Sequence, residues 1–342
     1  MKKIIHKILL FSFLQAGCVS LNSNTEEKKP PKIDDKTSLK DALEASIDFG
    51  DETLKAVKKL ISKRNEWHKA EIILHDNILK HQDHWSYISL LNAVHLFQLS
   101  DSKRAYQVFK VLVRSERSNV VELGWHLASA LPSAAMSKEI EAKLTEALSN
   151  DEVSDALTPK MAEAVSNNGL KSSYTLVRQG LMEKSNIAFA RAMISLNPKQ
   201  AAEDFLDYLA LAPIEELRQL NLKTVDMFTC TEILQHLMVV EAPVSHPHFD
   251  SIFNFAISRN NAMAEMARKV LDFYFPKYSQ DLAFMLARMP PWMQVAFVER
   301  ARTRMTPVVG VFLGDLKGVT AQKEVVEEID SVKSDFTEQK QE

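Results

Sequence analysis

Apolar residues recur every three or four positions along almost the whole chain from Thr37 onward. Leu39, Ala42, Leu43 and Ile47 fall on one face of a helix, with mostly polar residues between them. The same spacing continues at Leu54, Val57, Leu60 and Ile61, at Ile88, Leu91 and Val94, at Leu123, Leu127 and Ala130, and at Ile140, Leu144 and Leu148. Stretches in which β-branched and polar residues alternate are nearly absent. The pattern predicts an all-α protein.

Breaks between the predicted helices fall at regular distances. Turn residues occur at 99–101, 131–133, 166–169 and 196–198, and Pro132 and Pro198 lie 66 residues apart, which is twice 33. A fainter version of the same pattern ends at Pro276. A two-helix unit that repeats at about 33 residues is typical of an α-solenoid, in which stacked antiparallel helix pairs share one core. An irregular helical bundle is the alternative.

The repeat resembles HEAT and tetratricopeptide repeats. Ala93, Ala105 and Phe109 have tetratricopeptide-like spacing in one unit, and the resemblance spans about residues 60–315. It implies a HEAT-like helical repeat domain, which we expect to occupy residues 37–318. Such repeats present a long surface to other proteins.

The tail over residues 319–342 is acidic. Within it Val325, Ile329, Val332 and Phe336 step by four, three and four, which places them on one stripe of a helix. This pattern leaves three possibilities open: a frayed terminal helix, a helix that docks on a partner, and a helix that folds back on the body.

The amino terminus is basic and then apolar. A run of seven apolar or small residues over 8–14 follows Lys2, Lys3 and Lys7. The segment ends at Gly17 and Cys18. This run is too short to span a bilayer, which needs about 20 residues. The segment resembles the signal peptide and lipobox of bacterial lipoproteins, although Gln15 stands where that family favours Leu, Val or Ile.

The lipoprotein resemblance implies a place in the cell. It predicts a signal peptide over 1–17, cleavage between Gly17 and Cys18, and a diacylglyceryl group on Cys18. Val19 replaces the Asp that favours inner-membrane retention, so we expect a lipid-anchored protein on the outer membrane, facing the periplasm. Residues 18–36 are polar and contain Pro30 and Pro31, which predicts a flexible tether. A plain secretory signal is the alternative.

Composition narrows the possible partners. The chain has 342 residues and a net charge of −3, so no strong field favours nucleic acid. Its two cysteines are Cys18 and Cys230; with Cys18 lipidated no intrachain disulfide forms, and we expect Cys230 to be a small buried hydrophobe.

Motifs for catalysis are absent from the sequence. It contains no Gly-x-Ser-x-Gly elbow, no His-Glu-x-x-His and no glycine-rich phosphate loop. We therefore expect no catalytic residue, no cofactor and no enzyme activity. His68, His75, His81 and His84 lie close in sequence, and His81 and His84 are spaced to share a helix face. Because no known metal motif fits, we expect solvated or partly packed histidines and no metal.

One basic segment is the candidate binding region. Residues 259–304 carry eight Lys or Arg and four Asp or Glu, interleaved with aromatic side chains. We predict that Arg300, Arg302, Arg304 and Trp292 bind an acidic partner, and the acidic tail of the chain is one candidate. An ordinary basic face over an aromatic core is the alternative.

Together these features predict a membrane-anchored envelope lipoprotein that acts as a protein-binding scaffold, adaptor or assembly factor. Its partners would be other envelope proteins and the membrane itself through the N-terminal lipid. Two alternatives remain: a protein associated with the cell wall, as an enzyme or an enzyme regulator, and a carrier of an apolar ligand.

Overall fold

The protein is helical throughout the part that the structure describes. The computed structural model describes residues 30–49, 51–97, 104–149, 157–218 and 222–338, and these contain helices but no strand. The predictions for the signal peptide, Gly17, Cys18 and most of the tether lie outside the described residues. The all-α prediction is confirmed for the described ranges.

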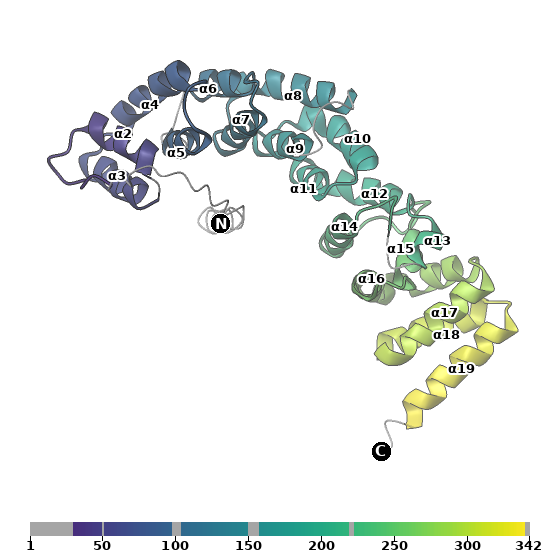
Figure 1. Ribbon diagram of the computed structural model, residues 1–342. Coiled ribbons are helices and arrows are strands. Elements are labelled where there is room, and N and C mark those ends of the chain that lie inside the picture. The colour runs from purple at the N-terminus through teal and green to yellow at the C-terminus, as the bar shows by residue number, and fades with distance from the viewer. Residues whose placement is uncertain (1–29, 50, 98–103, 150–156, 219–221, 339–342) are drawn as a thin grey trace.

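The helices form a curved, elongated row that runs from the N-terminal to the C-terminal end of the body (Figure 1). Their bounds are α2 (Leu39–Phe49), α3 (Asp51–Arg64), α4 (Trp67–His81), α5 (Tyr87–Phe97), α6 (Ala105–Leu112), α7 (Ser118–Ala130), α8 (Ala134–Ser149), α9 (Thr158–Asn167), α10 (Tyr174–Lys184), α11 (Ile187–Leu196), α12 (Pro198–Leu209), α13 (Ile214–Leu217), α14 (Met227–Val239), α15 (Ser251–Ala256), α16 (Asn261–Ala287), α17 (Pro291–Ala301), α18 (Pro307–Val319) and α19 (Lys323–Glu338). Two 3₁₀ turns, η1 (Lys171–Ser173) and η2 (Arg302–Arg304), join them.

Each helix packs mainly against helices close to it in the sequence. In one row α5, α7, α9, α11, α14, α16 and α18 each contact the next. Beside it, α4 contacts α6, α8 contacts α10, α10 contacts α12, α12 contacts α15, and α15 contacts α17. Over α4 to α12 this second row lies on the outer side of the curve (Figure 1). One hydrophobic core therefore extends along the whole body.

Helix starts follow local chemistry. Asn197 lies between α11 and α12, and its side chain accepts a hydrogen bond from the backbone N–H of Gln200 at 3.3 Å. Pro198 occupies the first turn of α12, where the missing N–H costs nothing. Thr306 and Asp226 cap α18 and α14 in the same way. The breaks predicted at 131–133, 166–169 and 196–198 coincide with the ends of α7, α9 and α11.

The break suggested by Pro276 is a kink inside one long helix. α16 continues from Asn261 to Ala287, and its only departure from helical geometry is at Tyr278, with φ −130° and ψ 24°. Pro276 removes a backbone donor, which kinks the helix and does not end it. Burial of Tyr274 and Phe275 on one side and of Leu282 and Ala283 on the other holds both halves against the core.

The acidic tail forms a helix that packs on the body. α19 contacts α17 and α18, and Val325, Ile329 and Val332 are fully or almost fully buried there. Of the three possibilities left open by the sequence, the described part of the tail takes the one in which the helix folds back.

We expect Gly180→Ala to destabilise the protein by about 1–3 kcal/mol, because this position is already filled by a neighbour. Gly180 of α10 lies against the ring of Phe189 in α11, and an added Cβ would lie 2.6 Å from the ring carbon Cζ. Urea unfolding followed by circular dichroism measures the change.

Gly310→Ala in α18 is the matched control. Its added Cβ would meet only the Met305 methyl group, at an ordinary 3.6 Å, so the helical preference of alanine adds about 0.5–1 kcal/mol. Equal stability of the two variants would contradict the packing described around Gly180.

Candidate functional site

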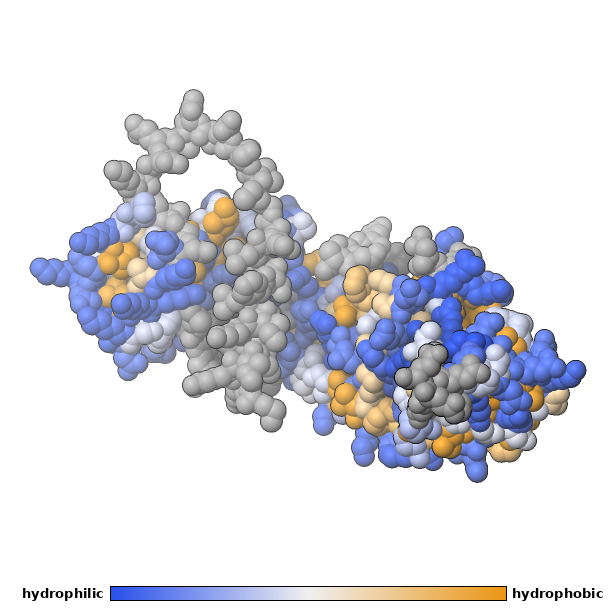
Figure 2. Space-filling model, turned by 90° about the horizontal axis from the view of Figure 1, so that it is seen from below, coloured by the Kyte–Doolittle hydropathy of each residue, from blue (hydrophilic) through white to orange (hydrophobic). Residues whose placement is uncertain are grey.

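A groove of about 1230 Å³ lies near the C-terminal end of the row of helices. The loop between α14 and α15, the second half of α16 and the start of α17 form its walls. Its apolar lining includes Pro243, Pro247, Pro290, Phe284, Met285 and Met289. Phe284 is 53% exposed. Figure 2 shows the wider context from below, where hydrophobic residues gather in small patches among hydrophilic ones.

Polar groups divide the apolar lining of the groove. Asp250, Asp281 and Arg288 contribute charges, and the Oδ1 atom of Asn254 is buried without a hydrogen-bond partner. Buried acceptors that lack a donor are costly, so this atom can accept an N–H or O–H from a bound molecule. The groove therefore offers apolar contacts together with an unused acceptor.

The kink in α16 shapes one wall of the groove. Tyr278, at the kink, donates its hydroxyl to Glu241 at 2.7 Å, and Lys277 donates to the same carboxylate at 2.6 Å. The hydrogen bond to Glu241 raises the pKa of Tyr278, and the one from Lys277 lowers the pKa of Glu241. These contacts join the kink to the end of α14, so the loop and the helix that border the groove are held together.

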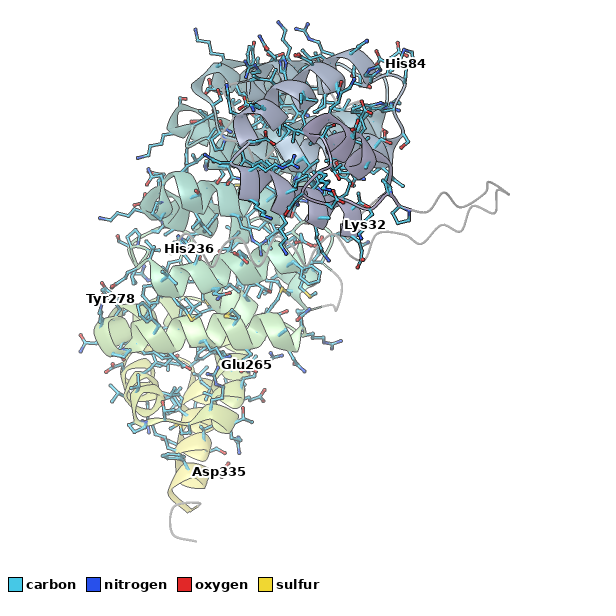
Figure 3. The ribbon with its side chains drawn as sticks, turned by 90° about the vertical axis from the view of Figure 1, so that its left-hand side faces the viewer. Lys32, His84, His236, Glu265, Tyr278 and Asp335 are labelled. Carbon is cyan, nitrogen blue, oxygen red and sulfur yellow. The ribbon has the colours of Figure 1, made fainter. Side chains whose placement is uncertain are left out.

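The predicted arginines do not share one open surface. Arg302 donates to Glu328 at 2.9 Å and to Ser331 at 3.1 Å, and it also pairs with Asp335. All three partners belong to α19, where Asp335 is labelled in Figure 3. The acidic tail of the chain therefore occupies Arg302.

Arg300 and Arg304 bond instead to the segment before α16 and to α16 itself. Arg300 donates to the backbone carbonyl of Ser258 at 2.6 Å, and Arg304 pairs with Asp272 at 2.8 Å. Between them lies Arg268, which sequence reasoning did not single out. Arg268 lies four residues before Asp272 on the same helix face, and this spacing is the feature of the sequence that indicates a charged pair there.

Trp292 lies apart from these arginines, at the start of α17. The residue is 42% exposed, and the guanidinium carbon of Arg218 lies 4.7 Å from the ring centroid. This is a cation–π contact within the chain. Trp292 therefore contributes an exposed aromatic edge, with one face taken by Arg218.

His75 and His81 have side-chain partners inside the protein. His75 is buried and bonds through its two ring nitrogens to Asp76 at 2.9 Å and to Gln107 at 2.7 Å. His81 stacks on Trp85 with ring centroids 5.5 Å apart, whereas His84 is exposed at the edge of the molecule (Figure 3). Within the described ranges no three His, Cys, Asp or Glu side chains gather in a way that could hold a metal ion.

Cys230 is fully buried in α14, and burial raises the pKa of its thiol. This confirms the prediction of a small buried hydrophobe, since the thiolate is the reactive form.

Comparison with known proteins adds no family to this description. No protein-family model, curated protein or solved structure matches the chain. None of the helices in the described residues is long and apolar enough to cross a membrane. The resemblances to lipoproteins and to helical repeats therefore stay predictions.

Proposed function

We propose that this protein is a lipid-anchored scaffold of the bacterial cell envelope, which binds other envelope proteins through its helical body. The basic and apolar start of the chain, followed by Ala16, Gly17 and Cys18, supports the anchor. The polar segment 18–36, with Pro30 and Pro31, would let the body stand off from the membrane and reorient.

We propose further that the body is an α-solenoid with a period of about 33 residues. Hydrogen bonds between successive helix pairs support this period. Arg117 donates to the carbonyl of Trp85, 32 residues away, and Tyr106 donates to Glu139, 33 residues away. The backbone N–H of Ser133 donates to Asn168, 35 residues away. Contacts at nearly constant separation favour repeated units over an irregular bundle.

The groove along α16 is the observation that carries the binding role. Its methionine side chains are flexible and adapt to different apolar partners, and the exposed ring of Phe284 offers an anchor. The unused acceptor of Asn254 suits a peptide N–H. The carboxylates of Asp250 and Asp281 make the same lining less suitable for an alkyl chain, so we favour a protein segment over an apolar ligand.

A photo-crosslinking residue at position 284 is expected to capture a defined envelope protein in living cells. The same residue at Lys138, an exposed position on α8, is the matched control and should give no band of that size. The added substitution Met289→Glu places a charge in the groove and should reduce the crosslink at 284 about tenfold or more, because burying an unpaired charge costs several kcal/mol. Equal crosslinking from both positions would overturn the groove as the binding site.

A further inference from the structure

Three arginines converge on one side of α16 from three different elements. Arg268 belongs to α16, Arg300 to α17 and Arg304 to η2; we call them the arginine cluster. Asp272, one turn after Arg268, pairs with Arg304, and Arg300 is held by a backbone carbonyl. Arg268 has no hydrogen-bond or ion-pair partner among the described residues. The cluster thus holds three guanidinium groups with one directly paired carboxylate.

A small cavity of about 20 Å³ lies inside the arginine cluster. Arg268, Arg304 and Asp272 line it together with Phe275, Phe297 and Val309. The Nε atom of Arg268 and the Nη1 atom of Arg304 are buried, and neither has a hydrogen-bond partner. A cavity of this volume holds one atom of the size of a water oxygen. Arg268 and Arg304, each with one unused N–H donor, therefore line a mostly apolar space that fits a single atom.

The charges around the cavity favour an anion. Burial lowers the pKa of Arg268 and the charges of Arg300 and Arg304 lower it further, whereas the carboxylates of Glu265 and Asp272 raise it. An arginine nevertheless keeps its proton at any physiological pH, so the mutual repulsion remains. Glu265, the next carboxylate along α16, forms an ion pair with Lys269 at 3.3 Å. A negative group in the cavity would satisfy both donors and offset the excess positive charge.

Two of the side chains that line the cavity reach the solvent. The side chains of Arg304 and Asp272 are 29% and 34% exposed. A group larger than one atom can therefore place one atom in the cavity and keep the rest in solvent. The cavity is separate from the groove. Glu265, three residues before Arg268, and Tyr278, which lines the groove, lie toward opposite ends of α16 (Figure 3). The cavity and the groove share no lining residue.

We propose that the arginine cluster is a binding site for an oxyanion, a carboxylate or phosphate group. One of its oxygens would accept hydrogen bonds from Arg268 Nε and Arg304 Nη1, and its other oxygens would face Arg300 and the solvent. The site depends on neither the membrane anchor nor the groove, so each can fail without the others.

Equilibrium dialysis of the full chain, purified in detergent, tests this site with labelled phosphate and labelled acetate in Tris-chloride buffer. We expect one mole of phosphate or acetate to bind per mole of chain, against the chloride background. Arg268→Gln should weaken that binding about tenfold or more, because it removes a charged donor. Arg191→Gln is the matched control: Arg191 is an exposed arginine, 3.2 Å from Glu232, and its loss should leave binding unchanged.

The two labelled anions also separate the two sources of an oxyanion. Preference for phosphate points to a phosphorylated ligand, and preference for acetate points to an acidic side chain or chain terminus. Arg268→Lys keeps the positive charge but lacks the Nε donor, so this variant should also bind the anion more weakly. If Arg268→Gln unfolds, Arg268→Lys takes its place in the test. Absence of binding to the unsubstituted protein, or binding to both Arg268 variants that is as tight as to the unsubstituted protein, would overturn the proposal.

Discussion

Cys18→Ser is expected to move the protein from the membrane fraction to the soluble fraction. The proposed anchor is acyl chains on this thiol, and each buried methylene contributes about 0.8 kcal/mol to membrane binding. Two or more acyl chains hold a protein firmly on a bilayer. Serine has no thiol, so it cannot carry the thioether-linked diacylglyceryl group. Fractionation of cells followed by immunoblotting measures the shift.

Cys230→Ala is the matched control for this experiment. It removes the other cysteine of the chain, which is buried in α14 and far from any membrane in the proposed arrangement. This variant should stay in the membrane fraction. A Cys18→Ser protein that still sediments with membranes would remove the lipid anchor, and the envelope location with it.

Phe312→Ala is expected to destabilise the C-terminal helices by about 3–5 kcal/mol. Phe312 of α18 is fully buried, and its ring stacks on Phe275 of α16 with centroids 4.2 Å apart. It also packs against Phe297 of α17 at 5.8 Å and Phe253 of α15 at 6.4 Å. Alanine would leave a cavity between four helices, which is the most costly kind of core truncation.

Hydrogen exchange of the backbone amides will show which helices lose stability in Phe312→Ala. Because helices contact mainly their neighbours along the row, amide exchange should accelerate in α16 to α19 and stay unchanged in α4 to α7. Phe284→Ala, at a 53% exposed position on α16, is the control and should change stability by no more than about 0.5 kcal/mol. Uniform acceleration along the body would contradict a row of helices stabilised by neighbours.

The candidate sites were only partly visible in the sequence. Closeness in the chain predicts one binding surface for Arg300, Arg302 and Arg304, yet Arg302 points to α19 and Trp292 contacts Arg218. Arg268, which completes the cluster, lies 32 residues before Arg300. Sequence distance is a poor guide here, because η2 changes the direction of the chain and sends adjacent arginines to different neighbours.

The amino-acid sequence by itself determined the helical class, the ends of α7, α9 and α11, and the burial of Cys230. These depend on local spacing and on capping residues such as Asn197, whose effects reach only one turn along the chain. Tertiary structure alone decided that α16 passes through Pro276, that the tail folds onto α17, and that Arg268, Arg300 and Arg304 meet. Those outcomes depend on burial and charge pairing between helices far apart in sequence, which no local pattern encodes.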